Sequence, residues 1–287
     1  MIEVKQISLL IKNLLKLIRW NNLLIVAVTQ YAAAYFLIKP MSLEDLLMDP
    51  KMSFLCLGTV LITAAGYVIN DYYDVKIDYV NKPERVVVGK VLKRRSIIIL
   101  HATLNTLGVL SGLLVSWQIG AINFFVIGLL WLYSNQLKRL PLLGNFTVAL
   151  LTGLSVFVVY IVYRDSIFLF ATYAFFAFFI SLIREVIKDM EDVEGDKKFD
   201  CKTLPIAIGI RKSKLVIYLI SVIFLLVVAS LLQQEPKFWW VFSGLVFMLG
   251  LLCQRLYRAD KNIDFARLST LSKQIMILGL ISMIFLK

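Results

Sequence analysis

The feature that most constrains this chain is a series of apolar segments, each long enough or nearly long enough to cross a lipid bilayer. The hydrocarbon core of a bilayer is about 30 Å thick, and a helix of about 20 apolar residues spans it. The nine segments run over residues 20–38, 52–70, 96–115, 118–134, 142–163, 166–183, 215–232, 238–254 and 269–286. Because 60% of the 287 residues are hydrophobic, a water-soluble domain could not bury the apolar surface. The sequence therefore predicts an all-α integral membrane protein.

The positions of the basic residues predict how the chain is oriented. If the N-terminus is cytoplasmic, 26 of the 31 Lys and Arg residues precede Trp20 or fall in the loops at 71–95, 138–139, 184–214 and 255–273. All of these segments then lie on the cytoplasmic side, as the positive-inside rule requires. We expect a protein of the cell (inner) membrane with its C-terminus outside. The net charge of +12 follows this topology, so we expect no nucleic-acid partner.

The remaining segments give the expected organisation of the chain. Residues 1–19 interleave apolar positions with lysines, which predicts an amphipathic helix lying on the membrane surface. No linker rich in Pro, Gly or Ser divides the chain, so residues 1–287 are expected to form a single domain. The two longest loops, at about 71–95 and 184–214, are candidates for a cap over a membrane cavity.

Two acidic motifs with the same spacing lie where apolar segments end. They consist of Asp71, Asp74 and Asp78 in the first motif and Asp189, Asp192 and Asp196 in the second, 118 residues later. On a helix this spacing directs three carboxylates within roughly 60° of one another. Three negative charges this close repel one another, so we expect a bound cation to offset them. Mg²⁺ prefers carboxylates combined with substrate phosphates. Two such clusters on one membrane face would form a diphosphate site.

Cleavage of an allylic diphosphate requires that the charge of the leaving group be neutralised. Metal ions held by carboxylates can do this, while Lys and Arg side chains contact the remaining phosphate oxygens. The cations best placed for this task are Arg85, Lys138, Lys188 and Lys202.

Three sequence motifs together resemble those of a known family. Asn70 to Asp78 reads N-D-x-x-D-x-x-x-D, and Asp189 to Asp196 repeats the acidic part. The stretch Tyr133-Ser134-x-x-Leu137-Lys138-Arg139 resembles a loop of the same family. Over nearly its whole length the chain is similar to the UbiA superfamily of intramembrane prenyltransferases. The resemblance implies a nine-transmembrane-helix bundle with a cytoplasmic cap, in which a polyprenyl diphosphate ionises and an acceptor captures the allylic cation.

The resemblance also implies roles for individual residues. The catalytic carboxylates that hold Mg²⁺ would be Asp71, Asp74, Asp189 and Asp192, and further metal ligands would be Asp78 and Asp196. The residues expected to bind the metal shell or the diphosphate are Asn70, Arg85, Lys138, Lys188 and Lys202. Aromatic side chains could line a channel for the prenyl tail. They are the run from Tyr173 to Phe179 with Phe124, Phe125, Tyr160 and Tyr163.

The flanks of the second motif indicate the acceptor. The stretch from Arg184 to Asp196, followed by Lys202-Thr203-Leu204-Pro205, most resembles the branch that prenylates geranylgeranylglyceryl phosphate. An aromatic or quinone-precursor acceptor, such as 4-hydroxybenzoate, naphthoate or a chlorophyllide-like molecule, is the alternative. A polytopic transporter would also explain many spans, but transport carboxylates usually lie deep within them. Nothing in the sequence implies a protein partner.

Overall fold

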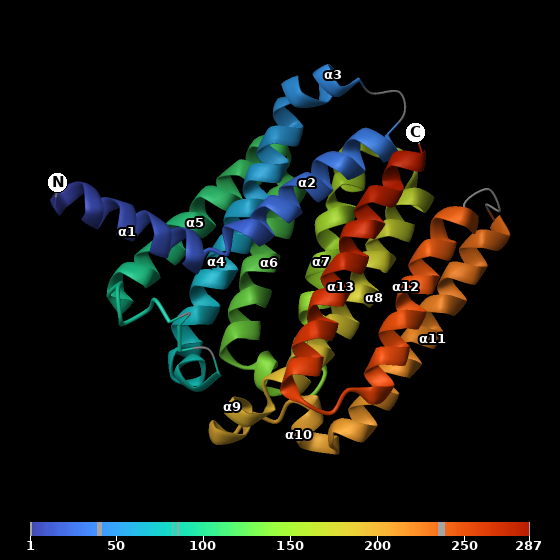
Figure 1. Ribbon diagram of the computed structural model, residues 1–287. Coiled ribbons are helices and arrows are strands. Elements are labelled where there is room, and N and C mark those ends of the chain that lie inside the picture. Colours follow the sequence, from blue (N-terminus) through green and yellow to red (C-terminus); the bar gives the residue numbers. More distant parts are fainter. Residues whose placement is uncertain (1, 39–41, 82, 85, 235–238, 287) are drawn as a thin grey trace. The chain divides into compact units, whose positions relative to one another are not determined.

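The structure is a computed structural model that describes residues 2–38, 42–81, 83–84, 86–234 and 239–286 (Figure 1). The described chain is helical, apart from turns and an isolated bridge between Val88 and Leu92. It divides into two compact units. Residues 1–31 and 42–137 form the first unit, and residues 32–41 and 138–287 form the second. The predicted all-α class is confirmed.

The first unit is built around a long helix that carries the first acidic motif. Its helices are α1 (Ile2–Leu17), the part of α2 (Trp20–Leu37) up to residue 31, α3 (Leu43–Met48), α4 (Pro50–Asn81), α5 (Arg94–Val115) and α6 (Trp117–Asn135). Helix α4 packs against α5 and α6. Small residues let these backbones approach, since a Cβ added to Gly58 would stand 3.1 Å from the Gly108 carbonyl oxygen. Asn123 on α6 donates to the same carbonyl over 2.9 Å.

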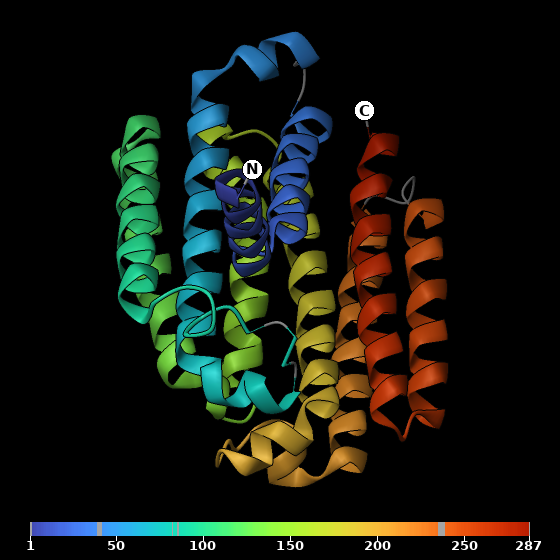
Figure 2. The ribbon, with the colours of Figure 1, turned by 60° about the vertical axis from the view of Figure 1, so that its left-hand side comes forward.

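The second unit surrounds the helix that carries the second acidic motif. Its elements are η1 (Leu137–Arg139), α7 (Leu143–Tyr163), α8 (Ile167–Glu191), α9 (Val193–Lys198), α10 (Leu204–Ile208), α11 (Ile210–Gln234), α12 (Trp239–Arg258), α13 (Asn262–Ser282) and η3 (Met283–Leu286). Helix α8 packs against α7, α11 and α13, and the short α9 and α10 lie at one end of these long helices (Figures 1 and 2). Ile180, Ile183 and Ile187 of α8 are fully buried in this core.

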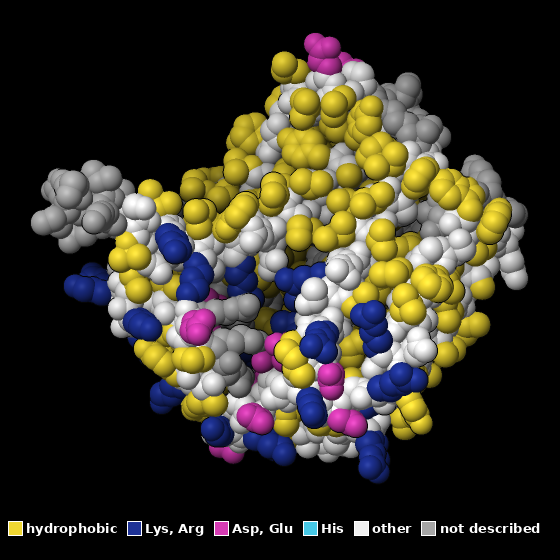
Figure 3. All heavy atoms as spheres, viewed as in Figure 1, with side chains coloured by type: hydrophobic (Ala, Val, Ile, Leu, Met, Phe, Trp, Pro, Cys, Tyr) yellow, Lys and Arg dark blue, Asp and Glu magenta, His cyan; other side chains and the backbone are white. Residues whose placement is uncertain are grey.

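Seven helices in the described residues are long and apolar enough to cross a membrane. They are α4, α5, α6, α7, α8, α11 and α13 together with η3. The remaining predicted spans, 20–38 and 238–254, correspond to α2 (Trp20–Leu37) and α12 (Trp239–Arg258). In Figure 3, hydrophobic side chains cover the upper part of α11 and α12, and Lys and Arg gather at their lower end. The chain is an integral membrane protein, and the count of nine spans stays a prediction.

Two helices extend further than their apolar segments predicted. Helix α4 continues to Asn81 although the predicted span ends at residue 70, and α8 continues to Glu191 although its span ends at residue 183. No Gly or Pro interrupts either extension, so the backbone hydrogen bonds continue after the apolar side chains stop. The predicted starts of the two loops, at residues 71 and 184, were therefore wrong, because both loops begin after the helices end at Asn81 and Glu191.

Two of the aromatic residues suggested for a tail channel face outward. Phe124 and Phe125 on α6 are 73% and 65% exposed. Neither side chain is enclosed by the described residues, so their role in a channel stays a prediction. In contrast, Tyr173 and Phe176 on α8 are buried.

The predicted amphipathic segment is helical, as α1. Leu9, Leu10 and Leu15 are exposed, whereas Leu17 is fully buried in a cluster with Val68 and Val88. The C-terminal end of α1 is thereby packed against α4 and the segment that follows α4. The position of α1 on a membrane surface stays a prediction.

Candidate active site

The first acidic motif lies on one uninterrupted helix. Asp71, Asp74 and Asp78 are all half-buried on α4, which runs from Pro50 to Asn81. The spacing therefore places the three carboxylates on one face, as the sequence predicted. Asn70 precedes them on the same helix and is also half-buried.

Arg19 holds the first carboxylate of this motif. Its Nη2 donates to Oδ1 of Asp71 over 2.9 Å, and its guanidinium lies 4.7 Å from the centroid of the Tyr67 ring. Arg19 joins α1 to α2 with a φ of 52°, a left-handed conformation that is uncommon for a side chain of this size. Burial lowers the pKa of Arg19, but the charge of Asp71 and the nearby Tyr67 raise it, and the net direction is upward. The guanidinium is therefore a permanent cation beside Asp71. No sequence motif predicted a role for Arg19.

The second motif is divided between two helices. Asp189 lies on α8, Asp192 ends α8 with φ −97° and ψ 8°, and Asp196 lies on α9. The expectation that one helical face directs all three carboxylates is wrong for this motif. The helix breaks at Asp192, three residues before a buried glycine, Gly195. Asp196 is instead connected to the following loop, because Thr203 Oγ1 donates to its Oδ2 over 3.4 Å.

Asn145 holds the first carboxylate of the second motif. Asn145 is the third residue of α7, in its first turn, and is 6% exposed. Its Nδ2 donates to Oδ2 of Asp189 over 2.9 Å. Further along the same pair of helices, Thr152 and Ser181 are joined by a hydrogen bond of 3.2 Å. No sequence motif predicted a role for Asn145, although a polar residue inside a predicted span is a signal for such a role.

A buried carboxylate organises two cations just before Asp189. Arg184 Nη1 donates to Glu185 Oε1 over 2.7 Å, and Lys188 Nζ donates to Glu185 Oε2 over 3.0 Å. The side chain of Glu185 is 8% exposed, compared with 19% for Arg184 and 29% for Lys188. Lys188, one of the predicted phosphate ligands, is therefore bonded to a carboxylate of its own helix.

The structure connects the loops of two other predicted phosphate ligands. The backbone N–H of Lys202 donates to the carbonyl oxygen of Arg139 over 2.8 Å, which ties the loop after α9 to the residue following Lys138. Lys202 is exposed and Lys138 is half-buried. Arg85, the fourth predicted cation, lies outside the described residues.

The donor atoms of the two motifs suit a hard divalent cation. Each motif offers carboxylate oxygens, and Asp71 is already paired with a cationic group at 2.9 Å. All-oxygen ligand sets of this kind fit Mg²⁺. Within the part of the chain that the structure describes, no three His, Cys, Asp or Glu side chains are gathered closely enough to hold a metal ion. The two motifs belong to different units.

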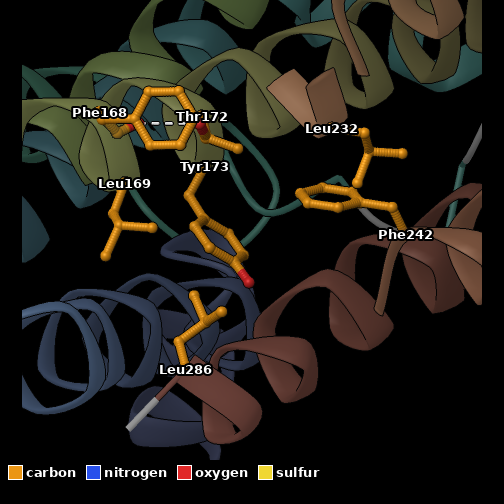
Figure 4. Close-up of a pocket in the computed structure, with 7 residues that line it drawn as sticks. All are labelled: Phe168, Leu169, Thr172, Tyr173, Leu232, Phe242 and Leu286. Carbon is orange, nitrogen blue, oxygen red and sulfur yellow. Dashed lines mark hydrogen bonds between the residues drawn. The ribbon is translucent and has the colours of Figure 1, made fainter. Parts of the chain in front are cut away.

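A small apolar pocket lies in the second unit, away from these charged groups (Figure 4). It is lined by Phe168, Leu169, Thr172, Tyr173, Leu232, Phe242 and Leu286. Tyr173 and Ser282 share a hydrogen bond of 3.0 Å beside it. Tyr173 precedes Asp189 by 16 residues on α8, or about 24 Å along the helix. The pocket is therefore separate from the second acidic motif.

Comparison with known proteins assigns the chain to a family. The model of the UbiA prenyltransferase family matches residues 24–274. The chain belongs to this family.

The similarity to UbiA proteins extends to the fold. A solved structure of a digeranylgeranylglyceryl phosphate synthase superposes with a TM-score of 0.72 at 24% identity, covering 96% of this chain and 97% of that one. A UbiA homologue from Archaeoglobus fulgidus bound to DMAPP and Mg²⁺ gives a TM-score of 0.69 at 17% identity, covering 94% and 99%.

Two sequence relatives have the same name. The chain is 31% identical to the digeranylgeranylglyceryl phosphate synthase of Sulfolobus acidocaldarius over 250 residues, which cover 84% of this chain and 83% of that enzyme. It is 34% identical to the enzyme of the same name from Methanosphaera stadtmanae over 163 residues, 57% of this chain. That second alignment spans 60% of the relative's length.

Proposed function

We propose that this UbiA prenyltransferase transfers a geranylgeranyl group from its diphosphate to geranylgeranylglyceryl phosphate. The product is a diether lipid precursor, and diphosphate is released. The observation that carries the proposal is the pair of acidic motifs at the ends of α4 and α8, each with its first carboxylate held by a neighbouring side chain at 2.9 Å. The acceptor is supported by the relatives, which are named digeranylgeranylglyceryl phosphate synthase.

The proposed arrangement in the membrane follows the sequence analysis. Nine helices would cross the bilayer as a single domain spanning residues 1–287, with α1 on the membrane surface. The N-terminus and the active site would be cytoplasmic and the C-terminus outside. The segments at about 71–95 and 184–214 would form the cap over the site, and the short helices α9 and α10 in the second segment support this assignment.

The carboxylates of the two motifs would hold Mg²⁺. We assign this task to Asp71, Asp74, Asp189 and Asp192, with Asp78 and Asp196 as further ligands. Bound Mg²⁺ would neutralise the charge that develops on the diphosphate as it leaves. Arg19 orients Asp71 and Asn145 orients Asp189, so both carboxylates are fixed before substrate arrives. Asn70, Arg85, Lys138, Lys188 and Lys202 would contact the metal shell or phosphate oxygens.

The proposed reaction exchanges one C–O bond for another. The bond between the allylic carbon and the diphosphate oxygen breaks, and its electron pair leaves with the diphosphate. The oxygen of the glycerol hydroxyl then bonds to the allylic carbon and forms the ether. The hydroxyl proton passes to the released diphosphate or to water. Carboxylates and cations at the membrane boundary favour this ionisation because they balance the separated charge.

The test is a matrix of purified protein against prenyl diphosphates and acceptors, with product masses measured. We expect Mg²⁺-dependent formation of the diether from geranylgeranyl diphosphate and geranylgeranylglyceryl phosphate. Asp71→Ala and Asp189→Ala should each abolish turnover while the protein remains folded. Transfer only to aromatic acids or quinols would refute the acceptor assignment. Full turnover by both variants would refute the assignment of the site.

A further inference from the structure

We propose that Arg184 and Lys188 form a binding site for the phosphate group of the acceptor, beside the site of the diphosphate. This inference rests on the proposed function, because it concerns the second substrate of the same reaction. It assigns a role to Arg184, which the sequence analysis did not consider, and it moves Lys188 from the diphosphate to the acceptor.

The two cations are arranged as a pair by one carboxylate. Arg184 and Lys188 lie one helical turn apart on α8, and both donate to Glu185, over 2.7 Å and 3.0 Å. The side chain of Glu185 is 8% exposed, whereas those of Arg184 and Lys188 are more accessible. One negative charge offsets only one of the two positive charges. The cluster therefore presents a net positive charge held in a defined geometry, as an anion site requires.

The guanidinium of Arg184 has a donor left over. Its Nε is buried and has no hydrogen-bond partner among the described residues. Because Nη1 donates to Glu185, the edge of the guanidinium that includes Nε is left to donate to another acceptor. Arg recognises phosphate through such an edge, with two parallel N–H groups. A buried N–H without a partner is unfavourable, so an oxygen ligand at this position would satisfy it.

The position of the pair relative to Asp189 suits the acceptor. Lys188 and Asp192 are one turn apart, so the two cations lie on the side of α8 that ends at Asp192 of the second motif. Arg184 precedes Asp189 by five residues, about 7.5 Å along the axis towards the interior of the span. In geranylgeranylglyceryl phosphate the phosphate and the free hydroxyl are on neighbouring carbons. A phosphate held by Arg184 and Lys188 would therefore direct that hydroxyl along α8 towards the carboxylates.

The test compares two acceptors that differ only in the phosphate. The full-length protein is assayed with geranylgeranylglyceryl phosphate and with geranylgeranylglycerol, each with geranylgeranyl diphosphate and Mg²⁺. The wild type should prefer the phosphorylated acceptor. Arg184→Gln should reduce this preference by roughly 10- to 100-fold, because charge-assisted hydrogen bonds to the phosphate are lost. The loss should appear in the KM of the phosphorylated acceptor and leave the KM of the diphosphate unchanged.

Two further variants make the comparison specific. Arg267→Gln removes the same charge from an exposed position on α13 and should leave the preference unchanged. Arg184→Lys keeps the charge but loses the planar fork, so its preference should fall between those of the wild type and Arg184→Gln. The preference is a ratio measured in one preparation, and the folded fraction cancels from it. If Arg184→Gln does not accumulate, Arg184→Lys and Lys188→Gln decide the question by the same ratio.

The outcomes separate this inference from the proposed function. If Arg184→Gln raises the KM of the diphosphate and retains the acceptor preference, the inference is wrong and the proposed function stands. A wild-type protein that prenylates aromatic acceptors and neither glycerol lipid would refute the proposed function itself. A wild type that prenylates both glycerol lipids equally well would overturn the phosphate site alone.

Discussion

Asn145 on α7 donates a hydrogen bond of 2.9 Å to Asp189 on α8, across 44 residues of sequence. Arg19 makes the equivalent contact with Asp71, also at 2.9 Å and across 52 residues. In each motif, therefore, the first aspartate is oriented by a side chain from outside its own helix. The two contacts differ in charge, because a guanidinium neutralises Asp71 whereas an amide leaves the charge of Asp189 unchanged.

Replacement of Asn145 should weaken the site more than the fold. Asn145→Leu keeps a similar side-chain volume but removes the donor to Asp189. The lost bond to a charged group corresponds to about 1–3 kcal/mol, so kcat/KM should fall roughly 10- to 100-fold. The Mg²⁺ concentration needed for half-maximal activity should rise as well. Activity titrations with Mg²⁺ measure both quantities.

The matched control for Asn145 lies on the same pair of helices. Thr152→Val removes the contact with Ser181, two turns from Asn145, and should leave the Mg²⁺ dependence unchanged. Equal effects of the two substitutions on Mg²⁺ dependence would contradict a positioning role for Asn145.

The pair of Arg19 and Asp71 should matter for activity and little for stability. Arg19 is 37% exposed and Asp71 is 15% exposed, so solvent screening limits the pair to about 1 kcal/mol of unfolding free energy. Arg19→Gln should nevertheless reduce turnover several-fold, because the carboxylate of Asp71 loses its orientation. Thermal unfolding and prenyl transfer are measured on the same samples. Lys214→Gln, which breaks the pair with the 87% exposed Asp260, is the control and should change neither. A large drop in unfolding temperature with unchanged turnover would reverse this assignment.

Close packing of α7 on α8 should make Gly153 intolerant of a side chain. A Cβ at this position would stand 2.8 Å from the carbonyl oxygen of Ala174, a backbone atom that cannot rotate away. We expect Gly153→Ala to cost about 1–3 kcal/mol, as other overpacked positions do. Gly250→Ala is the control, because a Cβ there meets no atom within 4 Å and alanine favours helix. Thermal unfolding in detergent distinguishes them, and equal stability of the two variants would contradict the packing described for α7 and α8.

Removal of divalent cations should stop the reaction without unfolding the helices. Chelation by EDTA is expected to abolish prenyl transfer, because the diphosphate then leaves without charge neutralisation. The helical circular dichroism signal should persist, since the spans are held by apolar packing and internal hydrogen bonds. Added Mg²⁺ should restore turnover. Undiminished transfer in excess EDTA would exclude a metal-dependent mechanism.

The sequence alone was sufficient for the features that depend on local pattern. Apolar length predicted the positions of the long helices, and the i, i+3, i+7 spacing placed Asp71, Asp74 and Asp78 correctly on one face of α4. The same spacing failed for the second motif, where the helix ends at Asp192. The two motifs have the same aspartate spacing, but in the second one the residues after Asp192 form a separate short helix, α9. Two motifs with identical aspartate spacing therefore have different backbone conformations.

Only the tertiary structure identified the partners of the acidic residues. Arg19 and Asn145 are distant from their aspartates in sequence, and no periodicity connects them. Which side chains meet depends on how each helix is rotated and which neighbour it packs against, and a linear pattern does not contain that information. The sequence determined that this is a membrane protein of the UbiA family with two carboxylate motifs. The packing of α1, α4, α7 and α8 decided which residues orient those carboxylates, because hydrogen bonds between helices form only where the backbones bring the two side chains together.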